Sequence, residues 1–339
     1  MAEPQSASAM AREIAEIPTA AARLLARHDV FTAIAERIGE AKPRIVVFCG
    51  RGSSGHAGVY LRYLFEVRLG LLASASAPSV VTAYQRPPDM RGALFVVISQ
   101  SGRSPDIVTA TQVARESGAL TLAIVNDENS PAAAASELVL PIGAGIEQSV
   151  AATKSVVLSM IAGARLVAGL AGDEDLNSCL NNMPVRLSAV LTCDWSNWAD
   201  SVAGAPAAFV VGRGYGLGCA REIALKVSEI LQVPALGYSA AELRHGPRAS
   251  VSQATPVLVL RQNDQAAAAV DELVRDLGDA GVFTAGGTAG TLPWIGDGHP
   301  VCDPVLMLVP TYRAIELIAR RRGIDPDNPP YLSKVTRTL

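Results

Sequence analysis

The chain has 339 residues, which is enough for two domains of ordinary size, each with its own core. Hydrophobic residues make up 49% of it, charged residues 18% and aromatic residues 5%, a balance that is typical of a compact α/β protein and excludes a disordered one. The net charge is only −3, and the lysines and arginines form no runs, so we expect no nucleic-acid partner.

The composition also predicts the compartment. The five cysteines are far apart in the sequence and form no CxxC pair, which indicates reduced, structural thiols and a cytoplasmic protein. The first thirty residues hold three glutamates and no unbroken apolar run, so we expect no signal peptide. The longest apolar stretch, residues 156–171, contains Ser159 and Arg165 and is shorter than a bilayer span, so we interpret it as a core helix and expect no membrane contact.

The first third of the chain predicts an α/β unit behind a helical arm. Helical periodicity over residues 8–28 and 30–38 predicts two helices that can pack on their own domain or on a partner subunit. A buried strand at 45–49 runs into the glycine turn 50–55 and a helix near 56–69, an order typical of doubly wound sheets. Further strands are expected at residues 79–83, 95–98, 120–125 and 138–140.

The second half of the chain repeats this plan. The motif Gly-Arg-Gly recurs at an offset of 162 residues, from Gly50 to Gly212, and the glutamine that follows a buried strand recurs from Gln100 to Gln262. Recurrence in register predicts two sister domains, which we expect to be joined by a largely helical linker between residues 171 and 194. The second copy carries Asp264 in the turn that corresponds to residues 99–102, so only the first copy is expected to hold an anion.

The turn after the strand at 95–98 is a candidate phosphate site. Ser99, Gln100, Ser101 and Ser104 follow the strand directly, and Pro105 can begin a helix that reaches residue 117. The start of that helix offers unpaired N–H groups with partial positive charge, and the side chains add neutral donors that suit phosphate oxygens. An ordinary strand-to-helix turn has the same features, so the interpretation depends on the rest of the chain.

Three other places carry side chains suited to chemistry. Lys226 and Glu229 share a helix face with Glu222, although the spacing of Glu222 and Lys226 is also that of an ordinary surface ion pair. His245 lies in a loop bounded by glycine and proline, where a histidine is often only solvated. Lys334 follows Pro-Pro-Tyr-Leu, whose apolar side chains favour a tail that docks on the protein.

Five motifs in this order make the sequence resemble the two-domain SIS (sugar isomerase) family. Within it the chain is similar to the isomerase half of glucosamine-6-phosphate synthase and to the stand-alone glucosamine-6-phosphate deaminases, over nearly all residues from about 30 onward. The motifs are GSS at 52–54, SQSG at 99–102, EQSVAATK at 147–154, ALKVSE at 224–229 with ELRHGP at 242–247, and LSKVT at 332–336.

The resemblance implies an architecture. It is an α/β fold of two tandem doubly wound, flavodoxin-like SIS domains with mainly parallel sheets, at residues 30–180 and 194–325. A helical arm at 1–29 precedes them, and an ordered tail at 326–339 carries Lys334.

The resemblance also implies the roles of the site residues. The sugar phosphate would bind Ser99, Gln100, Ser101 and Ser104, and the sugar would contact Ser53, Ser54, Val150, Ala152 and Ser333. Ala152 stands where the synthase relatives have a sugar-contacting serine, which leaves that contact in doubt.

The catalytic roles follow the same likeness. Glu229 would move a proton between C1 and C2 with Lys226 beside it, His245 would open the sugar ring, and Lys334 would form an imine with the sugar carbonyl. In the synthase relatives the histidine comes from a neighbouring subunit, so a homodimer with the site near the subunit interface is implied, and action within one subunit stays open.

The expected reaction converts glucosamine 6-phosphate and water to fructose 6-phosphate and ammonia, with no cofactor or metal. No cysteine precedes Cys49, so we expect no glutaminase nucleophile and no glutamine-derived ammonia within this polypeptide. The alternatives are an isomerase or deaminase of another phosphosugar, such as a galactosamine or fructosyl-amino-acid phosphate, and a non-catalytic sugar-phosphate sensor. Glu229, His245 and Lys334 together favour an enzyme.

Overall fold

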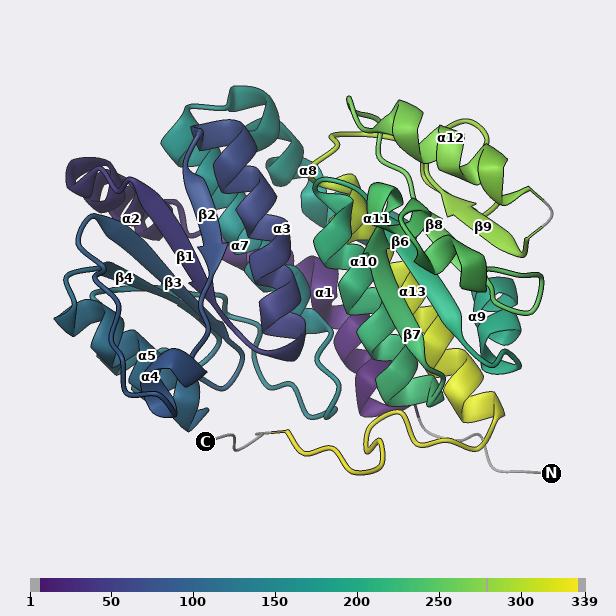
Figure 1. The fold of residues 1–339 in the computed structure, drawn as a ribbon, viewed down its shortest axis with the longest axis horizontal. Helices are drawn as coiled ribbons and strands as arrows, with labels where there is room; N and C mark the ends of the chain where they lie inside the picture. Colours follow the sequence, from purple (N-terminus) through teal and green to yellow (C-terminus); the bar gives the residue numbers. More distant parts are fainter. Residues whose placement is uncertain (1–6, 279, 335–339) are drawn as a thin grey trace.

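The computed structural model describes residues 7–278 and 280–334. Within them the chain forms two lobes that lie side by side, each built around one parallel sheet (Figure 1). The predicted α/β fold with two parallel, flavodoxin-like sheets is thereby confirmed.

The first lobe holds five strands in the order β2-β1-β3-β4-β5, all parallel to their neighbours. Alternate residues of β3 pack into two different apolar clusters, Leu94, Val96 and Ile98 into one and Phe95 and Val97 into the other. Both faces of the sheet are therefore buried, as parallel sheets require. The strands are β1 Ile45–Cys49, β2 Leu72–Ala75, β3 Ala93–Ser99, β4 Leu120–Val125 and β5 Leu138–Pro141.

The second lobe repeats the first without the fifth strand. Its order β7-β6-β8-β9 matches β2-β1-β3-β4 strand for strand, which confirms the internal repeat. The strands are β6 Ala208–Gly212, β7 Ala235–Ser239, β8 Val257–Leu260 and β9 Val282–Ala285.

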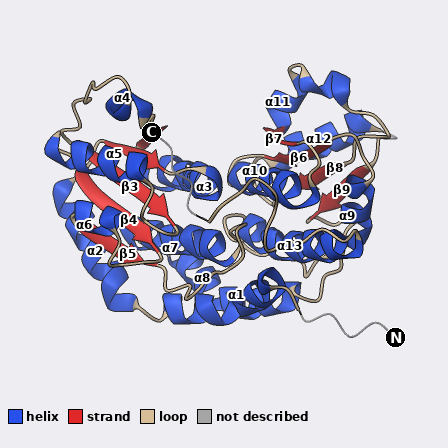
Figure 2. Ribbon diagram, turned by 90° about the horizontal axis from the view of Figure 1, so that it is seen from below, coloured by secondary structure: helices blue, strands red, loops and turns tan. Residues whose placement is uncertain are grey.

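The two lobes share one apolar core. Val96 of the first sheet and Val210 and Leu258 of the second belong to the same buried cluster, so the sheets turn one face toward common interior helices. Figure 2 shows α3 and α10 next to each other between the sheets, with α1 and α8 running beneath both lobes. The longer helices are α1 Ala9–Leu25, α2 His28–Ala41, α3 Gly52–Leu69, α5 Pro105–Glu116, α7 Lys154–Ala171, α8 Glu174–Val190, α10 Gly216–Lys226, α12 Ala267–Leu277 and α13 Asp303–Arg321, and the shorter ones are α4 Ser79–Thr82, α6 Pro131–Ala135, α9 Ser196–Ala203 and α11 Ala240–Arg244.

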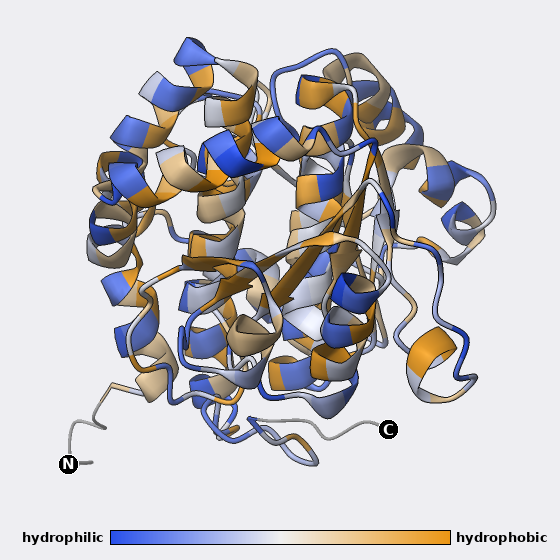
Figure 3. Ribbon diagram, turned by 90° about the vertical axis from the view of Figure 1, so that its left-hand side faces the viewer, coloured by the Kyte–Doolittle hydropathy of each residue, from blue (hydrophilic) through white to orange (hydrophobic). Residues whose placement is uncertain are grey.

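Helix α7 is the predicted core helix. It is the one helix among the described residues that is long and apolar enough to cross a membrane, and 78% of that window is buried inside the protein. It packs against α1, α2, α3 and α8. Figure 3 shows that the strands are apolar and that the surrounding helices carry polar residues on their outer sides. The helical linker predicted between residues 171 and 194 is also confirmed, as α8.

The strand predicted at residues 79–83 is wrong, because this segment forms the short helix α4. The β-branched residues of Val-Val-Thr are not buried there, so their preference for strands has no sheet face to pack on. The edge position is instead taken by β2, whose sequence Leu-Ala-Ser-Ala has little strand character and pairs with β1 through backbone hydrogen bonds.

Gly218 sets the distance between the two lobes. A Cβ at this position of α10 would lie 2.6 Å from the carbonyl oxygen of His56 and 2.6 Å from the amide nitrogen of Tyr60, both on α3. We expect Gly218→Ala to force α3 and α10 apart and to lower the free energy of unfolding by about 1–3 kcal/mol in urea denaturation. Gly39→Ala on α2 is the matched control, since nothing lies within 4 Å of its added Cβ, and it should stabilise the protein by about 0.5–1 kcal/mol. Equal stability of Gly218→Ala and the wild type would contradict the close approach.

A second prediction concerns Asp303, the first residue of α13. Its carboxylate accepts a hydrogen bond from the Gly298 N–H at 2.8 Å and lies 3.2 Å from Arg186, yet burial raises its pKa from 3.8 to about 6. Because the folded pKa lies above the unfolded one, the acid favours the folded state most below about pH 4, and this contribution is lost as the pH rises through 6. Relative to Asp303→Asn, the wild type should lose up to about 3 kcal/mol of unfolding free energy between pH 4 and pH 7. Parallel pH dependences of the two proteins in urea denaturation would refute this.

Candidate active site

The predicted phosphate turn joins β3 to α5. Ser99 ends the strand, and its Oγ accepts a hydrogen bond from the Gly102 N–H at 2.9 Å. Ser101 Oγ accepts from the Arg103 N–H at 3.3 Å. Ser104 is the N-cap residue of α5 as predicted, but its side chain makes no capping hydrogen bond. The half-buried side chains of Gln100, Ser101 and Ser104 therefore surround the amino end of a helix, as an anion site requires.

A cation from the neighbouring turn lies beside this site. Arg51 donates to Asp106 Oδ2 from Nε at 3.0 Å and from Nη2 at 2.9 Å. Asp106 is buried in the first turn of α5, whereas the Arg51 side chain is about half exposed. The pair fixes a guanidinium next to the phosphate turn and leaves part of it open to a ligand.

A buried carboxylate connects the lobes. Glu222 on α10 has no exposed surface, and its Oε1 accepts from Ser53 Oγ at 3.0 Å and from the Tyr312 hydroxyl at 3.2 Å. Its Oε2 lies 3.1 Å from His56 Nδ1, and Lys226 Nζ is 3.6 Å from Oε1. We call these five residues the Glu222 cluster. They join the first turns of α3 in the first lobe directly to α10 and α13 of the second.

The surface interpretation of Glu222 and Lys226 is wrong. Their side chains are 0% and 1% exposed, because α10 packs between α3 and α13. A pattern of spacing along one helix could not show those two neighbours.

Glu229 lies at the edge of the cluster. A π-helical turn, Val227–Leu231, follows α10 and carries Glu229, whose Oε2 accepts a hydrogen bond from Lys226 Nζ. Burial alone would lower the pKa of Lys226, but the charges of Glu222 and Glu229 outweigh it and raise that pKa. The lysine is therefore a cation at neutral pH, and Glu229, with 20% of its side chain exposed, is the carboxylate that a substrate can reach.

The tail brings Lys334 back to the first lobe. It runs from the end of α13 in the second lobe across to the first (Figure 1). Lys334 Nζ donates to the Ser149 carbonyl at 2.6 Å and to Glu147 Oε2 at 3.3 Å. Glu147 is buried and held by the N–H groups of Thr153 and Ser155 at 3.1 and 2.9 Å. Its charge also contributes to the raised pKa of Lys226, so both lysines lie within the field of one carboxylate.

Asp327 anchors the tail on the helical arm. Its carboxylate accepts from the first two N–H groups of α1, at Ala9 (2.7 Å) and Met10 (2.8 Å), and its carbonyl accepts from the Val150 N–H at 3.0 Å. The tail is thus ordered through Lys334, while residues 335–339 of the predicted tail lie outside the described part.

The remaining predicted contacts are spread around this region. Ser54 is half-buried in the first turn of α3, and Val150 and Ala152 are half-buried in the segment that precedes α7. Ser333 is exposed next to Lys334. Their sugar contacts stay predictions.

His245 does not join the other predicted groups within one chain. It is exposed at the end of α11, which packs on β6, β7 and α12 of its own lobe. In residues 7–278 and 280–334, no hydrogen bond or ion pair connects its ring to the Glu222 cluster or to the phosphate turn. Its action from a partner subunit stays a prediction.

Sequence reasoning missed three members of the site. His56 stands three residues after Ser53, a spacing that places both on one face of α3 and could have indicated it. Glu147 lies inside a recognised motif but was given no role. Tyr312 lies in the middle of α13 and gives no local signal at all.

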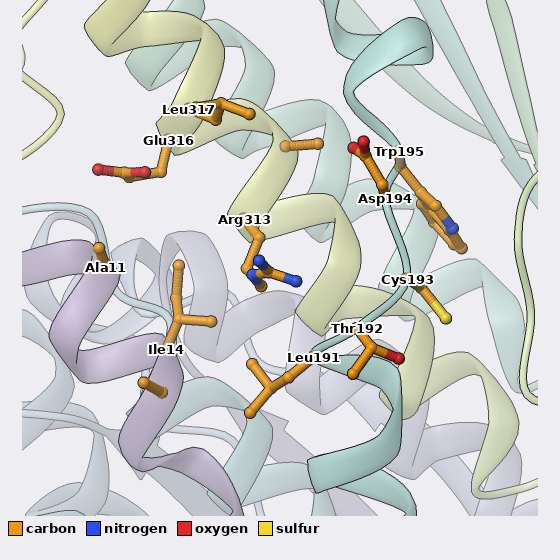
Figure 4. A pocket seen from close by; sticks show the side chains of 12 residues that line it. Ala11, Ile14, Leu191, Thr192, Cys193, Asp194, Trp195, Arg313, Glu316 and Leu317 are labelled. Atoms are coloured by element: carbon orange, nitrogen blue, oxygen red, sulfur yellow. The ribbon is translucent and has the colours of Figure 1, made fainter.

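A cavity of about 370 Å³ lies away from these residues. It is bounded by Ile14 of α1, the segment 191–195 and Arg313 of α13, and Figure 4 shows Arg313 between the other two. None of the predicted substrate contacts lines it, so the cavity does not identify the site. Within the described residues no group of three or more His, Cys, Asp or Glu side chains is arranged to hold a metal ion.

Comparison with known proteins defines the class. The SIS domain pattern matches residues 39–168 and 202–278, more than half of the chain, one segment in each lobe. The chain therefore belongs to the SIS domain family, as its motifs predicted.

The relatives place it within that family. It is 32% identical to a glutamine–fructose-6-phosphate aminotransferase [isomerizing] of Methanothermobacter thermautotrophicus, over 96% of this chain and 56% of the relative. The chain thus spans about half the length of such relatives, and it matches their isomerase half.

Two solved structures share the fold. A Silicibacter pomeroyi protein, named only provisionally as a phosphosugar isomerase, superposes with a TM-score of 0.90 at 39% identity, over 95% of this chain and 100% of that one. A glucosamine-6-phosphate deaminase of Thermotoga maritima superposes with a TM-score of 0.80 at 23% identity, over 98% and 100%, which shows the shared fold alone.

Loss of the Asp327 anchor should free the tail. We expect Asp327→Ala to expose Lys334, so that trypsin cuts after it at least about tenfold faster than in the wild type, because local opening then costs little free energy. The rate is measured by mass spectrometry of the intact chain. Asp89→Ala is the control, since the hydrogen bonds of the Asp89 side chain go to Arg91 on the surface of the first lobe, and it should not change the rate. Unaltered cleavage in Asp327→Ala would contradict the anchoring role.

Proposed function

We propose that this chain is a phosphosugar isomerase that converts glucosamine 6-phosphate and water to fructose 6-phosphate and ammonia. One observation carries the proposal: the hydrogen bond from Ser53, a predicted sugar contact, to Glu222 joins the start of α3 to the group formed by Lys226 and Glu229. A phosphate seat and an acid–base group in one interlobe region are what aldose–ketose isomerisation of a phosphorylated sugar requires.

Glu229 is the base in this scheme. It removes the proton from C2 of the open-chain amino sugar and returns it to C1. The C1 carbonyl oxygen takes up the proton that the C2 amine loses, so C1 becomes a hydroxymethyl carbon and C2 becomes an imine. Water then adds to C2, and ammonia leaves. Lys226 fixes the carboxylate and its positive charge stabilises the electron-rich intermediate, which a cation in a buried site does more effectively than one in water.

Lys334 supplies a second amine. As a neutral nucleophile it can displace ammonia from C2 by forming its own imine, which water then hydrolyses to the ketose. Glu147 lies 3.3 Å from Nζ and is the group placed to accept the proton that Lys334 must lose.

The relatives support the substrate. The curated relatives are named for glutamine and fructose 6-phosphate, and the Thermotoga maritima structure for glucosamine 6-phosphate. The first name gives the ketose phosphate and the second gives the amino-sugar phosphate of the reaction that we propose. Another phosphosugar, such as a galactosamine or fructosyl-amino-acid phosphate, would use the same phosphate turn, and a sensor would use the turn alone.

The assembly is part of the proposal. A homodimer would allow His245 of one chain to approach the site of the other. The outer strands β2 and β7 support a partner surface, because Leu72 and Leu236 on them are 65% and 54% exposed.

The test is a panel of amino-sugar phosphates assayed for ammonia and for ketose phosphate. We expect glucosamine 6-phosphate to give both products, and Glu229→Gln to lower kcat by roughly 10²–10⁴-fold because the base is removed. Binding of fructose 6-phosphate should persist, since the phosphate turn is intact. Glu40→Gln, an exposed glutamate on α2, is the control.

The outcomes separate the candidates. Turnover of a different sugar phosphate, and not of glucosamine 6-phosphate, would show that the proposed substrate is wrong and that the proposed reaction type is right. A protein that binds sugar phosphates but neither turns any of them over nor exchanges their C1 and C2 hydrogens with solvent would be a sensor. In that case Glu229→Gln would leave sugar-phosphate binding unchanged.

A further inference from the structure

Arg51 lies between the starts of two helices. Its backbone carbonyl accepts hydrogen bonds from the N–H groups of Ser54 and Gly55 in the first turn of α3, at 3.0 and 3.2 Å. Its side chain crosses to the first turn of α5, where it donates to Asp106. The guanidinium is therefore fixed between the helix that carries the predicted sugar contacts and the helix that follows the phosphate turn.

The sheet brings Arg51 to the level of the phosphate turn. Strand β1 lies beside β3 and runs parallel to it, with Cys49 opposite Val97. Arg51 follows Cys49 at the same interval at which Ser99 follows Val97, so both residues reach the same edge of the sheet. Ligands of open parallel sheets bind outside this edge, at the carboxyl ends of the strands. Arg51 thus stands where a ligand of the turn would lie.

The contact with Asp106 uses only part of the guanidinium. Nε and Nη2 both donate to Oδ2, at 3.0 and 2.9 Å, while Oδ1 accepts from the Ile107 N–H at 2.9 Å. A guanidinium has five N–H groups, and the other three of Arg51 have no partner among the residues that the structure describes. The carboxylate is 0% exposed and the arginine side chain 54% exposed, so the free N–H groups belong to the half of the pair that a ligand can reach.

The balance of charge explains why the turn needs this cation. The side chains of the phosphate turn that point to an anion are neutral, and the start of α5 supplies only roughly +0.5 of an elementary charge. Asp106 would cancel more than that, and a phosphate monoester brings about −1.5 to −2 more. Arg103 of the turn itself is paired with Asp127 at 2.8 Å. Arg51 is the cation that both neutralises Asp106 and is held beside the helix start.

The second lobe offers an internal comparison. Arg213 occupies the position of Arg51 in the repeated Gly-Arg-Gly turn, but residues 268 and 269, at the level of Asp106, are alanines. The turn of that lobe carries Asp264 instead, where an anion would be repelled. The arginine–aspartate pair is therefore found in the lobe whose turn can accept a phosphate, and an arginine in the glycine turn alone does not create it.

We propose that Arg51, oriented by Asp106, binds the substrate phosphate with its free N–H groups and makes the site selective for a doubly charged phosphate over a singly charged anion. The inference deepens the proposed function and rests on it. The planar fork of a guanidinium suits two phosphate oxygens, and its hydrogen bonds to them are charge-assisted. In this arrangement the serines and the helix start orient the phosphate, and Arg51 supplies the charge that matches it.

The experiment separates contact with the phosphate from neutralisation of Asp106. Arg51→Gln removes the cation and leaves Asp106 unmatched, whereas the double variant Arg51→Gln/Asp106→Asn removes both charges and keeps the summed charge of the pair. Binding of inorganic phosphate, fructose 6-phosphate and fructose 6-sulfate is measured by calorimetry, together with the melting temperature and the turnover of glucosamine 6-phosphate. Arg115→Gln is the matched control, because Arg115 is 49% exposed, pairs with Glu137 and lies at the other end of α5.

We expect both Arg51 variants to bind inorganic phosphate and fructose 6-phosphate roughly 10–100-fold more weakly than the wild type, the loss of one charge-assisted contact. The preference of the wild type for the 6-phosphate over the 6-sulfate should disappear in the double variant. The KM of glucosamine 6-phosphate should rise by a similar factor while kcat changes less, since the phosphate keeps its charge during the reaction. Arg115→Gln should bind within about twofold of the wild type.

The other outcomes are distinct. Wild-type phosphate binding by the double variant would overturn the contact and leave Arg51 as the counter-ion of Asp106, with the proposed function intact. An equal affinity of the wild type for the 6-phosphate and the 6-sulfate would overturn the selectivity. Arg51-dependent phosphate binding without turnover of any sugar phosphate would instead overturn the proposed enzyme and keep the role of Arg51.

Discussion

The burial of the Glu222 carboxylate is the constraint on which the arrangement of the two lobes depends. A charge without access to water must be matched by donors, and these come from both sides: Ser53 and His56 from α3, Lys226 from its own helix and Tyr312 from α13. Removing a single partner of such a buried group typically costs about 3–5 kcal/mol, since the remaining charge cannot be solvated. The same contacts that satisfy Glu222 therefore fix α3 against α10. Ser53 on α3 and the Lys226–Glu229 pair at the end of α10 are thereby held in one region between the lobes.

Much of the fold follows from local sequence, for reasons that particular elements make clear. Strands β3 and β4 are continuous apolar runs bounded by turns, because both of their faces are buried, and the repeat of glycine turn and glutamine marks the second lobe. Strand β2 could not be found this way. It is a sheet edge with one buried residue in four, so its conformation comes from pairing with β1, while α4 carries β-branched residues that no sheet covers.

The site also has a part that local sequence predicts and a part that depends on packing between distant segments. The phosphate turn could be predicted because all its groups lie within six consecutive residues, 99–104, and because the start of a helix has a known polarity. The Glu222 cluster could not, since Ser53, Glu222 and Tyr312 are brought together only by the packing of three helices from distant parts of the chain. The spacing of Glu222 and Lys226 describes a surface pair and a buried one equally well. The pair is buried because α3 and α13 pack on the face of α10 that carries Glu222 and Lys226, and this packing cannot be read from the spacing.

The two ends of the described chain belong to this site rather than flanking it. Asp327 binds the amino end of α1 and the Val150 N–H at once, so arm, tail and the segment before α7 are one unit. Glu13 of the same helix is buried against that segment, and burial raises its pKa, as expected for a carboxylate held beside Glu147. The ammonium group of Lys334 lies next to Glu147, and its charge also acts on Glu13, so electrostatic attraction favours docking of the tail. The position of Lys334 therefore depends on the charges of Glu13 and Glu147 as well as on packing. Since Glu13 belongs to α1, the helical arm contributes to holding the carboxyl-terminal tail in place.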